Sequence, residues 1–118
     1  MSRMLAVALV ALSAVAVVAS ATASRPRIAV QPHAVAPGGI VLVTGNAGDC
    51  AVGATVTLIS KAFPGRAYGE GTLTGTVRAG HAFSVVGRLR RGLRAGSYHV
   101  GARCGGGNLG VGASVRVG

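Results

Sequence analysis

The chain is 118 residues long, which leaves room for one domain. It carries 12 Lys and Arg side chains against 2 Asp and Glu, and its formal net charge is +10. The only carboxylates, Asp49 and Glu70, offer little for acid–base chemistry, and the three histidines are scattered without a metal-ligand spacing. We therefore predict that the protein is not an enzyme and has no catalytic residues, no metal and no cofactor.

Residues 1–23 have the three parts of a secretory signal. Arg3 supplies the positive charge, residues 5–19 are almost unbroken Ala, Val and Leu, and Ala21 and Ala23 form a small-residue cleavage site. The apolar run is about 15 residues, short of the ~20 that a membrane-spanning helix needs, although a membrane anchor stays the alternative. The sequence predicts cleavage after Ala23 and a mature protein with no stable membrane span, secreted or loosely attached to the cell wall.

Residues 24–118 predict a single domain of short strands, with no amphipathic helix. Apolar runs rich in β-branched residues alternate with turns of Gly, Pro and Asn. This spacing predicts an all-β fold, a seven-stranded antiparallel sandwich, with a small closed barrel as the alternative. The continuously apolar run Ile40–Val43 predicts a strand covered on both faces or at its ends. The expected strands are 27–31, 39–44, 54–60, 71–77, 82–86, 97–104 and 110–117.

Cys50 and Cys104 are the only cysteines, and an even count in a secreted small domain predicts a disulfide. Cys104 is in phase with the inward positions of its strand, and Cys50 follows the second expected strand. The bond would therefore tie the second and sixth strands across the two sheets, an arrangement typical of immunoglobulin domains. On the chain-entropy model it would stabilise the fold by roughly 4 kcal/mol.

Three segments resemble secreted bacterial immunoglobulin-like domains. The first is residues 35–45, a Pro-Gly-Gly turn followed by an apolar strand and Gly, and the others are residues 50–58 and 95–105 around the two cysteines. This resemblance implies an immunoglobulin-like fold and an extracellular compartment, and implies no activity. A more distant similarity is to the neocarzinostatin-like carriers. The chain departs from those carriers in having one cysteine pair and a strongly basic composition.

The most distinctive feature is a basic cluster formed by Arg88, Arg90, Arg91 and Arg94. Guanidinium groups suit bidentate contact with phosphate or carboxylate, so the cluster is a candidate polyanion site on a loop between the fifth and sixth strands. The alternative is that these arginines only keep the domain soluble. Phe63 and Tyr68 are the only candidates for an exposed aromatic platform.

These observations predict a secreted, non-catalytic binding or structural module. Its expected partner is an anionic cell-wall polymer or another extracellular polyanion, contacted through the basic loop. The alternative function is a small-molecule carrier of the neocarzinostatin-like type, which would need an apolar cleft between the sheets. The sequence leaves the ligand and the oligomeric state open.

Overall fold

A computed structural model describes residues 25–66, 69–105 and 107–118. The predicted signal peptide, residues 1–23, lies outside the described residues, as does Tyr68. Among the described residues, no helix is long and apolar enough to cross a membrane.

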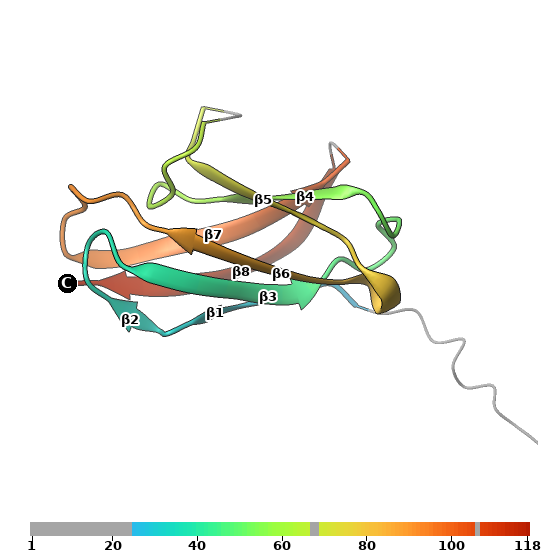
Figure 1. The fold of residues 1–118 in the computed structure, drawn as a ribbon, viewed down its shortest axis with the longest axis horizontal. Helices are drawn as coiled ribbons and strands as arrows, with labels where there is room; N and C mark the ends of the chain where they lie inside the picture. The colour runs from blue at the N-terminus through green and yellow to red at the C-terminus, as the bar shows by residue number, and fades with distance from the viewer. Residues whose placement is uncertain (1–24, 67–68, 106) are drawn as a thin grey trace, which may run out of the picture.

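The described chain is all-β, as predicted, with a single 3-10 turn named η2 (Figure 1). Each of the seven expected strands is present within a few residues of its predicted bounds. An eighth, two-residue strand was not predicted. In chain order the elements are β1 (Arg27–Gln31), β2 (Ala34–Val35), β3 (Ile40–Asn46), β4 (Thr55–Ile59), β5 (Thr72–Thr76), η2 (Ala79–His81), β6 (Ala82–Arg88), β7 (Gly96–Cys104) and β8 (Gly107–Val117).

The strands form two sheets. The three-stranded sheet has the order β1-β3-β6, and the five-stranded sheet has the order β2-β8-β7-β4-β5. Every pairing is antiparallel except that of β2 with β8, which is parallel. The prediction of seven antiparallel strands is therefore wrong in detail, because the described residues form eight strands and one of the two sheets is mixed.

The extra strand arises where the chain changes sheets. Pro32 has no backbone N–H to continue the ladder of β1, so pairing with β3 stops at Gln31. The chain then crosses to the other sheet, where the Arg116 N–H donates to the His33 carbonyl oxygen at 2.8 Å. The Gly118 N–H donates to the Val35 carbonyl oxygen at 3.1 Å, and these two bonds fix β2 beside β8.

The core lies between the two sheets and follows the alternation of the strands. Buried side chains come from both sheets, including Val41, Val43, Phe83 and Val85 from the three-stranded one, and Val56, Leu58, Val100 and Val115 from the five-stranded one. Of the two forms of cover predicted for Ile40–Val43, on both faces or at its ends, cover on both faces is wrong. Because β3 alternates between buried residues and residues on its outer face, Ile40 is 52% exposed and Leu42 is half-buried.

The predicted disulfide joins Cys50 to Cys104, with 6.3 Å between their Cα atoms. Cys104 ends β7 in the five-stranded sheet, whereas Cys50 lies in the connection from β3 to β4 and outside both sheets. The bond therefore ties the connection that leaves one sheet to a strand of the other, and does not join two strands directly.

Antiparallel strands sort the connections to two ends of the domain. We call one the disulfide end; it holds the β3–β4, β5–β6 and β7–β8 connections and the start of β1. We call the other the arginine end; it holds the β2–β3, β4–β5 and β6–β7 connections and the C-terminus (Figure 1).

Candidate site at the arginine end

Three of the four arginines of the basic cluster lie on the predicted loop between β6 and β7, and the fourth, Arg88, lies within β6. Arg88 ends β6, and Arg90, Arg91 and Arg94 follow in the connection; all four are exposed. Leu89, between them, is only 2% exposed and anchors the segment in the core. Because the Leu89 side chain packs in the core, the backbone here is fixed against the domain while the neighbouring arginine side chains extend into solvent.

Two of the four arginines tie neighbouring connections together. Arg88 Nη1 donates to the Gly38 carbonyl oxygen at 2.9 Å, and Arg90 Nη1 donates to the Lys61 carbonyl oxygen at 3.0 Å. The Arg90 N–H also donates to the Ala62 carbonyl oxygen at 2.9 Å. A guanidinium has five N–H donors, so a bond to one carbonyl leaves others that can meet a ligand. The β6–β7 connection thus holds the β2–β3 and β4–β5 connections in place.

The β4–β5 connection folds back on itself beside Arg90. The Ser60 N–H donates to the Gly71 carbonyl oxygen at 3.0 Å, and the Thr72 N–H donates to the Gly65 carbonyl oxygen at 3.1 Å. A side chain at Gly71 would overlap the backbone oxygens of Phe63 and Ser60, so this close approach requires glycine. The described residues of this connection, 60–66 and 69–71, are therefore held in place and form one wall of a pocket.

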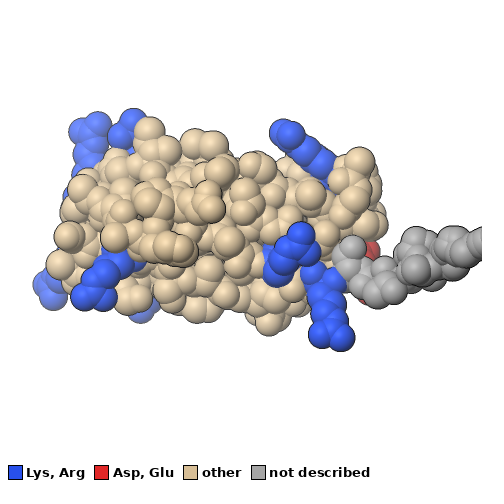
Figure 2. All heavy atoms as spheres, turned by 90° about the horizontal axis from the view of Figure 1, so that it is seen from below, with Lys and Arg blue, Asp and Glu red and all other residues tan. Residues whose placement is uncertain are grey.

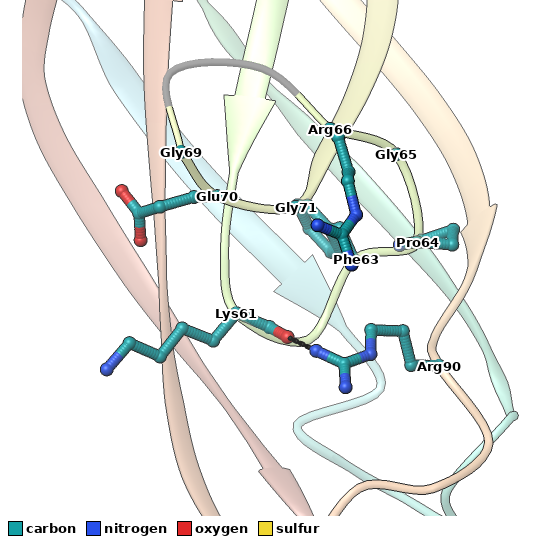
Figure 3. A pocket seen from close by; sticks show the side chains of 9 residues that line it. All are labelled: Lys61, Phe63, Pro64, Gly65, Arg66, Gly69, Glu70, Gly71 and Arg90. Atoms are coloured by element: carbon teal, nitrogen blue, oxygen red, sulfur yellow. Dashed lines mark hydrogen bonds between the residues drawn. The ribbon is translucent and has the colours of Figure 1, made fainter.

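This wall and Arg90 enclose an open pocket of about 460 Å³ (Figure 3). Its charged lining consists of Lys61, Arg66, Arg90 and one carboxylate, Glu70. Sequence reasoning missed Lys61 and Arg66, because they lie far along the chain from the arginine cluster. No sequence signal joins them, because the contact that does so, from Arg90 Nη1 to the Lys61 carbonyl oxygen, spans 29 residues.

Phe63 also lines this pocket, but it is 1% exposed. The prediction of an exposed aromatic platform is therefore wrong for Phe63, whose ring serves the core.

The two ends of the domain differ in charge. The arginine end carries Lys61, Arg66, Arg116 and the predicted cluster, with Glu70 as its carboxylate. The disulfide end carries Arg25, Arg27, Arg78 and Arg103, with Asp49 as its carboxylate. Figure 2 shows one face of the molecule with Lys and Arg gathered toward both ends and a band without charge between them.

The groups considered for acid–base chemistry lie apart. Asp49 is in the β3–β4 connection and Glu70 is in the β4–β5 connection, so strand β4 separates them. His81 Nδ1 lies 2.7 Å from the Cys50 carbonyl oxygen at the disulfide end. Within residues 25–66, 69–105 and 107–118, no three His, Cys, Asp or Glu side chains gather into a group that could hold a metal ion.

No protein-family model and no curated protein sequence matches the chain. Among solved structures, the chain is similar to the Pseudomonas fluorescens alkylpurine DNA glycosylase AlkC bound to DNA containing an abasic site analog. The TM-score is 0.51 and the sequence identity is 14%, over 80% of this chain and 29% of the glycosylase chain. The likeness concerns the fold, and this chain spans less than a third of the glycosylase.

This likeness corrects the functional expectation formed on the sequence. The structural neighbour is a DNA glycosylase in complex with DNA, and is neither a cell-envelope module nor a small-molecule carrier. The prediction of a module for cell-envelope polymers, with a carrier as its alternative, is therefore wrong. Among the described residues, core side chains such as Val43, Leu58 and Val100 also fill the space between the sheets, where a carrier would need its cleft.

Proposed function

We propose that this protein is an exported, non-catalytic DNA-binding module with an immunoglobulin-like sandwich, and that it holds DNA phosphates at its arginine end. One observation carries the proposal: two connections bring their cations to the same end and are tied together there. The cations are Lys61 and Arg66 from the β4–β5 connection, Arg88 from the end of β6, and Arg90, Arg91 and Arg94 from the β6–β7 connection.

The chemistry of these side chains fits a phosphate backbone. The planar guanidinium fork matches two phosphate oxygens at once, and charge-assisted bonds of this kind are about twice as strong as neutral ones. Duplex DNA presents one negative charge per ~1.7 Å of its axis, so several cations at one end can engage neighbouring phosphates together. Such contacts position a protein on DNA without reading its sequence.

The structural neighbour supports the choice of DNA among polyanions, since that glycosylase was observed bound to DNA. Its catalytic activity is not carried over to this chain. The described residues hold two carboxylates, Asp49 and Glu70, and these lie in connections at opposite ends of β4.

Export is part of the proposal. Disulfides persist in oxidising compartments, and Cys50 and Cys104 form one here. The N-terminal signal pattern points to the same compartment, so the DNA in question would be extracellular. N-terminal sequencing of protein recovered from the culture medium should begin near Ser24. A chain that stays in the cytoplasm with its thiols reduced would contradict this part of the proposal.

The binding is tested with a fluorescently labelled DNA hairpin that has a single-stranded tail, followed by anisotropy over a range of salt concentrations. The variant Arg66→Gln/Arg91→Gln/Arg94→Gln removes three exposed cations and spares Arg88 and Arg90, which tie the loops. We expect weaker binding and a slope of log K against log[salt] that is shallower by about 2 to 3, one unit per lost phosphate contact.

The matched control is Arg25→Gln/Arg27→Gln/Arg78→Gln, which removes the same charge from the disulfide end. This control should bind nearly as the natural protein does. Equal losses in both variants would mean that net charge alone attracts DNA. No binding by the natural protein at low salt would reject the proposed function and leave the arginines as solubility groups.

A further inference from the structure

A second hollow lies on the outer face of the five-stranded sheet, over β7 and β8. It has a volume of about 790 Å³, within the ~300–1,000 Å³ usual for small-ligand sites. Lys61 and Glu70 line both this groove and the arginine-end pocket. In Figure 3 both side chains extend from the loop toward the strands at the left of the view. A chain-like ligand could therefore occupy the two hollows together.

The groove is open because its floor is backbone. Gly101 on β7 pairs directly with Gly112 on β8, and Gly110 lies two residues before Gly112 in the same strand. A Cβ atom at Gly112 would overlap the imidazole of His99, so that exposed ring lies over Gly112 and leaves the backbone of Gly101 uncovered beside it. A flat group can approach such a floor closely and pack against the ring.

Polar groups surround this floor. Ser97 and Asn108 line the groove and offer both donors and acceptors, and Arg103 lines it beside Asn108, its partner across the ladder. An aromatic ring, a flat floor and polar edges are what an unpaired nucleobase needs. Sheet surfaces that bind single strands combine ring stacking with hydrogen bonds to the base edges. Bases in a duplex are already stacked and paired, and cannot enter a groove of this kind.

We infer that the groove accepts an unpaired base, so that the protein prefers single-stranded over duplex DNA. The base lies over Gly101 and against the His99 ring, while adjacent phosphates contact Lys61, Arg66 and Arg90. This inference rests on the proposed DNA binding at the arginine end and names the form of DNA that the site takes.

The test fills the groove without straining the fold. A Cβ at Gly101 meets only ordinary contacts, 3.6 Å from His99 Cε1 and 4.0 Å from the Val111 carbonyl oxygen, and valine suits a strand. Gly101→Val should therefore fold normally while its methyl groups occupy the groove. His99→Ala removes the ring itself. The control Thr55→Val adds valine at an exposed position on the same outer face, outside the groove.

Affinities are measured by anisotropy for a labelled oligothymidine strand and for a blunt hairpin duplex, with thermal unfolding as a check on folding. We expect the natural protein to bind the single strand more tightly. Gly101→Val and His99→Ala should each weaken single-strand binding by at least about fivefold, which corresponds to the loss of one base stack. Neither variant should change the affinity for the duplex. The control Thr55→Val should bind both DNA forms as the natural protein does.

Two outcomes separate the inference from the proposed function. Equal affinity for single strand and duplex, with both groove variants unaffected, would overturn the base site and leave phosphate binding standing. Binding to neither DNA would overturn the proposed function and the inference with it.

Discussion

The two ends of the domain are held together by different means. At the disulfide end, a covalent bond joins Cys50 to Cys104, and the neighbouring turns are linked by buried or half-buried hydrogen bonds. At the arginine end, exposed side chains of Arg88 and Arg90 bond to backbone carbonyl oxygens of two other connections. The disulfide end thus stabilises the fold through a covalent bond and buried hydrogen bonds. At the arginine end, the charged side chains that hold the connections together are among those that would contact a ligand.

The largest effect should follow loss of the disulfide. The variant Cys50→Ala/Cys104→Ala frees a loop closed over a sequence separation of 54, and its free energy of unfolding should fall by about 4 kcal/mol. Urea unfolding measures this loss. The folded variant should bind DNA as the natural protein does, since the arginine end is untouched. A loss of DNA affinity in the fully folded variant would show that the two ends are coupled.

A smaller effect is expected for Asn46→Ala at the same end. Asn46 is 6% exposed; its Nδ2 donates to the Gly80 carbonyl oxygen at 3.0 Å, and its Oδ1 accepts from the Gly48 N–H at 2.8 Å. Without the side-chain amide, the Gly80 carbonyl oxygen and the Gly48 N–H each lose a hydrogen bond, and the free energy of unfolding should fall by about 1–3 kcal/mol. Asn46→Asp keeps the acceptor and serves as the control. A change below the error of the urea curve would contradict the role given to these bonds.

The smallest effect is expected for Tyr98→Phe at the arginine end. The Tyr98 hydroxyl donates to the Arg94 carbonyl oxygen at 2.8 Å, in an exposed position. Water can replace this bond, so the variant should lose only about 0.5–1 kcal/mol of unfolding free energy. A loss as large as that of Asn46→Ala would mean that the arginine end also carries much of the stability.

The strands could be read from the sequence because their signals are local. Val41 and Val43 are buried at alternating positions, and Cys104 ends its strand in phase with the core. The outer face of β3 could not be read in this way. Ile40 and Leu42 are as apolar as their buried neighbours, and an isoleucine exposed to solvent costs a protein little.

The features that the sequence-based predictions missed depend on contacts between segments that lie far apart in the chain. Strand β2 is two residues long and exists only because the C-terminal strand lies beside it. Lys61 and Arg66 join the arginine cluster only through the fold-back of the β4–β5 connection and the bond from Arg90. The density of arginines in residues 88–94 predicts the cluster, but no local pattern in the sequence connects Lys61 and Arg66 with it.

The central claim is that DNA contacts the arginine end, and a nuclear magnetic resonance titration of the disulfide-bonded protein with single-stranded DNA tests it most directly. The backbone amide signals of residues 61–63, 65–66 and 88–94 should shift on binding, together with those of Gly101 and Gly112 in the groove. The amides of residues 47–53 and 78–81 at the disulfide end should stay in place. Shifts concentrated at the disulfide end, or spread evenly over all exposed arginines, would contradict the account.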